Sequence, residues 1–287
     1  MPVDLVLIGH VGLATDRTPA GTVTYWGGSG FATAFAASAL HGGRTGLVAQ
    51  VGEDFDLGIF SAFGLDVEGV DVQPGASARF AIDHAPDVSL SFRSDLGVAA
   101  EPHLDDFPAS YFQAGHVHLG SAPPRQHLAW LDFLRDRGCR AQISADMFEP
   151  FVAVEPGTCR QVCERADLIF LNDAEDRGLY HGRPHPAVPT VLKHGPAGAE
   201  FLADGIRYRV PAPPVTEVDP VGAGEILAGV FLALRARGLA DEQALSYAVT
   251  VAASSVTEFG VAGPSVTRKL RRVRDELASG HRPSDTG

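Results

Sequence analysis

Short apolar segments alternate along the chain with longer segments of helical periodicity. "DLVLIGH" (4–10) and "RTGLVAQVG" (44–52) are apolar with little alternation, as expected of strands buried on both faces. "GSGFATAFAASALHGG" (28–43) begins at small residues and stops at a glycine pair, as a helix does. Further strands are expected at 116–121, 140–148, 166–172 and 189–195, and a further helix at 124–138. Strands that alternate with helices predict a mainly parallel sheet with helices on both faces, which is the α/β fold class.

Two stretches depart from this alternation, at about 13–26 and 76–98. Both alternate polar and apolar residues and contain turn formers, which is typical of antiparallel strands with one face in water. We expect them to form a small sheet that projects from the main sheet as a lid. The whole chain, residues 1–287, is expected to be a single domain.

The composition limits the ligands that the chain can bind. Its 45% apolar residues are ample for a packed core, and its formal net charge is −12. Nucleic acids and anionic membranes bind basic surfaces, so the charge argues against both. An anionic ligand would depend on helix N-termini, a few placed cations and a divalent metal. No apolar run approaches the roughly 20 residues that span a bilayer, and the N-terminus lacks the basic segment of a secretion signal, so a cytoplasmic protein is expected.

Several common site motifs are absent from the sequence. There is no G-x-x-x-x-G-K-[ST] phosphate loop, and Gly9 and Gly12 have no third glycine at the dinucleotide-binding spacing. Neither H-E-x-x-H nor G-x-S-x-G occurs. Cys139, Cys159 and Cys163 include only one pair at close spacing, which argues against a zinc site and favours reduced thiols.

The clearest candidate site is the sequence Gly222-Ala223-Gly224-Glu225, because an apolar helical face begins directly after it. Free amides and the helix macrodipole make such a helix start suited to a phosphate. Glu225 would then lie beside that anion. The alternative is a glycine-rich loop in which Glu225 only interacts with the helix dipole.

A second candidate site lies in "LNDAED", directly after a predicted strand. Asn172 and Glu175 would share one face of the first helical turn, where their oxygens suit Mg²⁺. The alternative is a simple helix cap made by the same two residues. Lys193 is one of only two lysines and ends a predicted strand shortly before Gly195. It is a candidate phosphate contact, or a strand-end lysine whose ammonium group reaches solvent.

Taken together, these motifs resemble the ribokinase (PfkB) family of carbohydrate and nucleoside kinases. "WGGSGFATAFAASALHGGRTGLVAQVGED" (26–54) is similar to the N-terminal signature of the family. "DPVGAGEILAGVFL" (219–232) is similar to its second signature, and Asn172-x-x-Glu175 matches its N-x-x-E magnesium motif. The resemblance covers nearly the whole chain. It implies a three-layer α/β/α sandwich with a β-sheet lid, and a possible homodimer through that lid.

The resemblance also implies ATP- and Mg²⁺-dependent phosphorylation of a small polyhydroxylated substrate: a sugar, a cyclitol or a nucleoside. The amides of Gly222, Ala223 and Gly224 would stabilise the transferring phosphoryl group, and Glu225 would take the proton from the attacking hydroxyl. The expected nucleotide-binding residues are Lys193, Gly195, Asp219, Gly222 and Gly224. Asn172 and Glu175 would hold Mg²⁺. The expected substrate-binding residues are Asp16, Gly27, Gly28 and Ala32.

Three positions depart from the family pattern. Glu225 replaces the usual catalytic Asp, which displaces the carboxylate by one methylene. Pro220 replaces a threonine, and Ala32 replaces an asparagine that contacts sugars. These changes leave two hypotheses: a kinase whose substrate is unlike plain ribose, or a catalytically decayed binding or regulatory protein on the same fold. Trp26 and Phe31 lie near the glycine pair, where we expect core packing rather than substrate stacking.

Overall fold

The main sheet has nine strands in the order β13-β12-β11-β10-β9-β8-β1-β4-β5. The computed structural model describes residues 2–18, 21–84, 91–181 and 187–279. The strands are β1 (Val3–Ile8), β4 (Arg44–Gly52), β5 (Asp66–Gln73), β8 (His116–Leu119), β9 (Gln142–Asp146), β10 (Leu168–Asn172), β11 (Thr190–Lys193), β12 (Ala199–Ala203) and β13 (Ile206–Val210). All neighbouring pairs from β11 to β5 are parallel. The predicted mainly parallel sheet is therefore confirmed.

An antiparallel hairpin, β12–β13, extends the sheet beyond β11. Its two strands are joined by Asp204 and Gly205, whose φ angles are 49° and 79°. Two consecutive residues with positive φ match the twist of a tight hairpin, and Asp-Gly is a sequence that favours this turn. The sequence analysis did not predict these strands, although the Asp-Gly pair was a usable signal.

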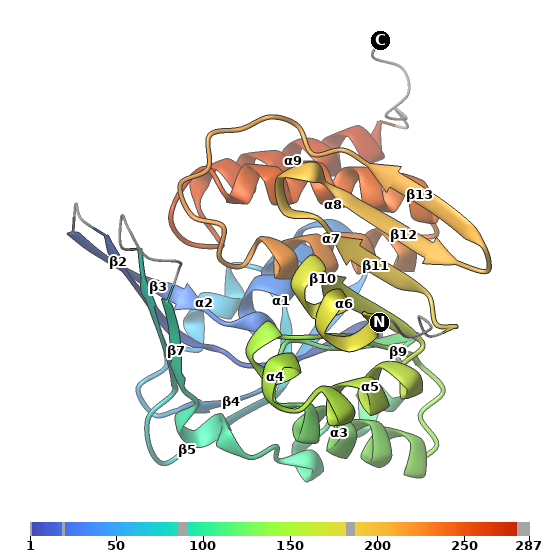
Figure 1. The fold of residues 1–287 in the computed structure, drawn as a ribbon. Coiled ribbons are helices and arrows are strands. Elements are labelled where there is room, and N and C mark those ends of the chain that lie inside the picture. The colour runs from blue at the N-terminus through green and yellow to red at the C-terminus, as the bar shows by residue number, and fades with distance from the viewer. Residues whose placement is uncertain (1, 19–20, 85–90, 182–186, 280–287) are drawn as a thin grey trace.

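Helices cover both faces of the main sheet (Figure 1). They are α1 (Ser29–His41), α2 (Gly58–Ser61), α3 (Pro124–Asp136), α4 (Glu149–Val154), α5 (Pro156–Arg165), α6 (Asp173–Tyr180), α7 (Ala223–Ala236), α8 (Asp241–Ser255) and α9 (Pro264–Ala278). Leu5 and Leu7 of β1 pack into the core shared with α1, α7 and α8. Val6 and Ile8 pack into the opposite core, with α3 and α5. Because successive side chains point to opposite faces, a strand between two cores must be apolar throughout. The result is the expected three-layer α/β/α sandwich.

A second sheet of four strands stands to one side of the main sheet (Figure 1). Its strands are β2 (Gly12–Thr18), β3 (Gly21–Gly27), β6 (Ala78–Asp83) and β7 (Ser91–Asp95), in the order β3-β2-β6-β7. The pairs β2–β3 and β6–β7 are antiparallel, as the alternating pattern indicated. The central pair β2–β6 is parallel, because two separate hairpins meet there side by side. Residues 19–20 and 85–90 of the two predicted lid stretches lie outside the described residues.

No helix in the described residues combines the length and apolarity that crossing a membrane requires. The three cysteines are free and buried. Burial raises the pKa of Cys159 to about 11 and that of Cys163 to about 12. Both groups therefore remain thiols at neutral pH, as the sequence analysis expected, and neither is suited to nucleophilic chemistry.

Two histidines lie inside the sheet and share one partner. His116 Nε2 lies 2.9 Å from Ser144 Oγ, and His118 Nδ1 lies 2.8 Å from the same oxygen. Burial, reinforced by Arg235, lowers the pKa of His116 to about 3. The folded protein therefore keeps this ring neutral well below the pH at which an exposed histidine becomes charged.

Acid unfolding should depend on this histidine. Between pH 6.5 and 3 the unfolded chain protonates His116 while the folded chain does not, so the free energy of unfolding falls as the pH falls through this window. We expect the free energy of unfolding of His116→Gln to fall less steeply with pH in this window, by at most about 1.4 kcal/mol per pH unit. Urea titrations at several pH values measure the effect. The exposed His181 provides a control, since His181→Gln should leave the pH dependence unchanged. An unaltered slope in His116→Gln would contradict the prediction.

Candidate active site

A cavity of about 580 Å³ lies between the small sheet and the carboxyl ends of the parallel strands. Strands β4 and β8 lie on opposite sides of β1, so the chain connections diverge at this edge. Ligands of open α/β sheets bind outside the carboxyl ends of the strands at such a switch point. His10 after β1, Ser121 after β8 and Met147 after β9 line the cavity there.

Most of the residues that the sequence singled out meet at this cavity. Those on its wall are Gly27, Gly28, Ala32, Asn172, Glu175, Lys193, Gly222, Gly224 and Glu225. Asp16, Gly195, Asp219 and Ala223 are not part of the wall. Gly195 is exposed in a turn after β11. Phe31 is buried in the main core and Trp26 packs against it, as expected.

The start of α7 forms one side of the cavity. Gly222 is the N-cap and has a φ of 82°, a conformation that favours glycine. A Cβ atom at this position would lie only 2.2 Å from Val261 Cγ1. The amide of Ala223 donates to Pro220 O at 3.3 Å, so it is already engaged. Within the described residues, the amides of Gly222, Gly224 and Glu225 have no hydrogen-bond partner. The helix start thus offers several amides to an anion, but not the full predicted set.

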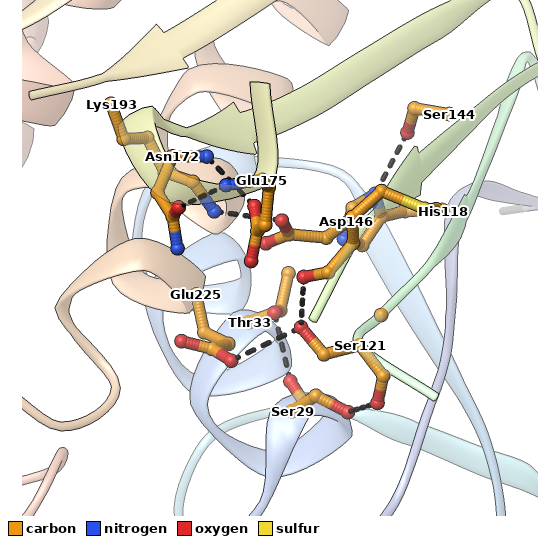
Figure 2. A network of polar contacts seen from close by, with 12 residues as sticks. Ser29, Thr33, His118, Ser121, Ser144, Asp146, Asn172, Glu175, Lys193 and Glu225 are labelled. Atoms are coloured by element: carbon orange, nitrogen blue, oxygen red, sulfur yellow. Dashed lines mark hydrogen bonds and ion pairs between the residues drawn. The ribbon is translucent and has the colours of Figure 1, made fainter. Parts of the chain in front are cut away.

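Glu225 lies in the first turn of α7, within reach of Ser121 (Figure 2). Ser121 Oγ lies 3.4 Å from Glu225 Oε1 and 3.3 Å from Met147 O, and its single proton serves one acceptor at a time. Ser29 Oγ donates to Ser121 O at 3.0 Å, which joins the start of α1 to this loop. The longer side chain at position 225 therefore has a polar partner, Ser121, that also lines the cavity.

Lys193 brings an ammonium group to the cavity wall. Its Nζ donates to Asp146 Oδ1 at 2.7 Å. The same Nζ would lie 3.1 Å from a Cβ atom on Gly224, so the missing side chain there leaves room for the ammonium group. Burial raises the pKa of Asp146 to about 6, against the opposing effect of Lys193. Asp146 itself is 1% exposed, so it acts on the cavity through Lys193.

Asn172 and Glu175 form a complete capping box at the start of α6. Asn172 Oδ1 accepts from the amides of Ala174 and Glu175, and Glu175 Oε2 accepts from the Asn172 amide at 2.7 Å. The structural alternative is therefore realised, and magnesium binding stays a prediction. Burial raises the pKa of Glu175 to about 8, opposed by Lys193 and reinforced by Asp146. Glu175 and Glu225 both line the cavity near Lys193, and their carboxyl oxygens are the donor type that Mg²⁺ prefers.

Asp16 and Asp219 lie together behind the cavity wall. Asp16 is fully buried, and its Oδ1 lies 3.0 Å from His84 Nε2. Asp219 Oδ1 accepts from the Val221 amide at 3.0 Å. Ala14, two residues before Asp16 on β2, lines the cavity instead. The structure therefore gives no support to direct substrate contact by Asp16 or nucleotide contact by Asp219.

The sequence analysis missed an aromatic wall on the cavity. Phe80 and Phe92 of the small sheet are stacked, with ring centroids 6.1 Å apart. Phe92 also meets Phe148, which follows β9, edge to face at 5.3 Å. Phe151 of α4 extends this wall. The alternation of apolar and polar residues in the lid strands was the available signal. It could not show that Phe80 and Phe92 line a cavity together with Phe148, which lies after β9.

Comparison with known proteins connects this geometry to kinases. The chain is 29% identical over 276 residues to a cytidine kinase of Thermococcus kodakarensis, covering 90% of this chain and 98% of that protein. The structure of a Burkholderia thailandensis nucleoside kinase in complex with inosine superposes with a TM-score of 0.80 at 19% identity, covering 97% of this chain and all of the other. A Cryptococcus neoformans ribokinase in complex with ADP superposes with a TM-score of 0.77 at 19% identity, covering 94% of this chain and 99% of the other.

The family description that matches is the pfkB family carbohydrate kinase, and the match extends over residues 4–268. This range includes both walls of the cavity, the start of α7 and the small sheet. The chain therefore belongs to the PfkB family of carbohydrate kinases.

Proposed function

We propose that this chain transfers the γ-phosphoryl group of ATP to a hydroxyl of a nucleoside. The observation that carries the proposal is the start of α7, where unpaired amides and Glu225 face one cavity. A triphosphate would place its terminal phosphate against the amides of Gly222 and Gly224. Lys193, next to Gly224, would contact the same phosphate.

Phosphoryl transfer would proceed by direct attack of the acceptor hydroxyl on the γ-phosphorus. The new O–P bond forms as the bond to the β-phosphate oxygen of ADP breaks, and the hydroxyl proton passes to Glu225. The amides of Gly222 and Gly224 stabilise the negative charge on the transferring group. Bound near Asn172 and Glu175, Mg²⁺ would neutralise charge on the phosphates. The contact with Ser121 would fix the longer side chain of Glu225 in a usable position.

The aromatic wall favours a nucleoside over a plain sugar as the acceptor. Phe80, Phe92 and Phe148 present apolar rings to the cavity, and such rings stack on a base but gain little from a hydroxylated sugar. Gly27 and Ala32 leave space on the side of α1. The cytidine kinase and the nucleoside kinase among the relatives support the same class of acceptor.

Three further roles remain proposals. The small sheet would act as a lid, because its rings form one side of the cavity. Its outer strands β3 and β7 would be the edges through which a homodimer could form. A cytoplasmic location fits the three free, buried thiols. The alternative of a decayed binding protein is not favoured, since the relatives are kinases and the helix start keeps unpaired amides.

Glu225 is the test of catalysis. Glu225→Gln should lower kcat by at least about 100-fold, because the amide cannot accept the proton. Glu225→Asp should lose no more than about tenfold, since it keeps the carboxylate. ATP consumption and product mass are measured with panels of nucleosides, sugars and cyclitols. The exposed Glu217 provides the control, with Glu217→Gln unchanged. ATP binding without any product from the native chain would remove the kinase proposal.

Gly222 tests the helix start as a phosphate site. Gly222→Ala would place a side chain on a residue whose φ is 82°, and the added Cβ atom would lie 2.2 Å from Val261 Cγ1, so the loop must shift. We expect a stability loss of roughly 1–3 kcal/mol and a KM for ATP raised by at least about tenfold. Gly238→Ala, at the other end of α7, meets a φ of 84° but no neighbouring atom. It should lose stability while the KM for ATP stays unchanged. Equal effects of both variants on this KM would refute the assignment.

Phe92 tests the class of acceptor. Phe92→Ala should raise the KM for a nucleoside by about tenfold or more through lost stacking, with little change for ribose. Steady-state kinetics with both acceptors measure the difference. Phe112 packs against Phe107 outside the cavity wall, so Phe112→Ala should alter stability without this selectivity. A native enzyme that prefers plain sugars, or a variant equally impaired with both acceptors, would argue against a nucleoside.

A further inference from the structure

A second concavity lies where the C-terminal ends of α1 and α7 meet α9, away from the active-site cavity. We call it the α9 groove; its wall comes from within residues 35–42, 62–63, 237 and 267–274. Its volume of about 380 Å³ falls in the range of roughly 300–1,000 Å³ that is usual for small-molecule sites. Among the described residues, the groove and the cavity have no lining residue in common. Ala32 of the cavity and Leu40 of the groove both belong to α1 and lie about 12 Å apart along the helix axis.

One part of the α9 groove is apolar. Phe35, Leu40 and Leu270 line it and are buried in the main core. Phe63, which follows α2, also lines it and is partly exposed. The ring of Phe63 meets those of Phe31 and Phe35 edge to face, with centroids 6.0 and 5.1 Å apart. These contacts hold the Phe63 ring in place, so the groove offers a fixed aromatic surface to a ligand.

The groove also contains three guanidinium groups, from Arg237 at the end of α7 and from Arg271 and Arg274 of α9. Arg237 Nη1 donates to Leu40 O at 2.9 Å, which anchors this group at the end of α1. Its other N–H groups remain available as donors. Among the described residues, neither Arg237 nor Arg271 forms an ion pair with a carboxylate. Arg274 Nε lies 3.8 Å from Asp275 Oδ1.

Unpaired arginines depart from the pattern of this acidic chain, whose formal charge is −12. Most arginines of the described residues form ion pairs with carboxylates, as Arg135 does with Asp167. Arg237 and Arg271 come from two different helices, and both line one apolar groove without such a partner. Two guanidinium groups match the charge of a phosphate dianion, which they bind through paired hydrogen bonds. The groove therefore complements a ligand that is anionic at one end and apolar at the other.

We propose that the α9 groove binds a phosphate monoester that carries a flat aromatic ring. The phosphate would accept hydrogen bonds from Arg237 and Arg271, and the ring would pack against Phe63. Nucleotides and other aryl phosphates share this chemistry. The inference uses no residue of the active-site cavity and does not depend on the proposed reaction.

The test uses the full-length chain, free of nucleotide, with 1-naphthyl phosphate as the probe. Isothermal titration calorimetry measures its Kd. 1-Naphthol lacks the charge of the probe and inorganic phosphate lacks its ring, so we expect each to bind at least about tenfold more weakly than the probe. Absence of binding by 1-naphthyl phosphate would overturn the proposal, and so would equal affinity for 1-naphthol or for inorganic phosphate.

Variants then locate the bound probe. Arg271 is exposed, so Arg271→Gln leaves the core intact. It should weaken binding of 1-naphthyl phosphate by at least about tenfold, because hydrogen bonds to a charged group are lost. The matched control is Arg272, the next residue of α9, which does not line the groove. Arg272→Gln removes the same charge and should leave the Kd unchanged.

Two results with these variants would overturn the proposal. Equal loss in both would mean that the overall charge of α9 attracts the probe, and no loss in Arg271→Gln would mean that the probe binds elsewhere, as in the active-site cavity. Once the groove is located, CMP identifies the source of the ligand. Binding of CMP that Arg271→Gln weakens assigns the groove to nucleotides, and CMP binding that this change leaves unaltered assigns it to other aryl phosphates.

Discussion

The fixed position of the α7 N-terminus at the carboxyl edge of the parallel sheet is the constraint on which the rest of the structure depends. Residues 226–234 of this helix are all buried, so its core contacts leave it little freedom to move. Gly222 adopts positive φ against Val261 at the point where the chain turns into the helix. The amides of that turn are therefore held in place before any ligand arrives, which favours binding of charge that develops during a reaction.

Local charges rather than the overall charge determine what this acidic protein can bind. The chain carries a formal charge of −12, yet its cavity combines a helix start with Lys193. Lys193 is oriented by Asp146, a carboxylate that does not line the cavity. Asp146 thus fixes the position of the ammonium group, and the absence of a side chain at Gly224 leaves room for it beside the start of α7. The cavity therefore offers an anion a small surface of free amides and one ammonium group, despite the negative charge of the whole chain.

The small sheet supplies aromatic side chains to the cavity wall and a buried carboxylate, Asp16, to the region behind it. Phe80 and Phe92 form part of the cavity wall, whereas Asp16 points behind it toward Asp219. Both sets of residues come from strands of one sheet, so a displacement of that sheet would alter the wall and the charged group together. The contact between His84 and Asp219 joins the small sheet to the loop that leads into α7.

The sequence alone determined the features that depend on local pattern. Continuous apolar strands between helices predict a parallel sheet buried on both faces, and a glycine-rich helix start followed by an apolar face predicts α7. The family signatures extended this to the three-layer fold and the kinase family, and nine of the predicted site residues line one cavity. The same reasoning could not decide whether Asn172 and Glu175 cap a helix or hold a metal, because both uses need the same spacing.

Only the tertiary structure decided which residues far apart in the chain share one surface. Ala14 and Asp16 lie on the same face of β2, but the second lies farther along the strand and is carried past the cavity wall toward His84. Lys193 meets Asp146 across 47 residues of sequence, and Phe92 meets Phe148 across 56. Periodicity fixes the face of a strand on which a side chain lies. The distance between separate elements is fixed by how the sheets and helices pack, and no short segment of sequence contains that information.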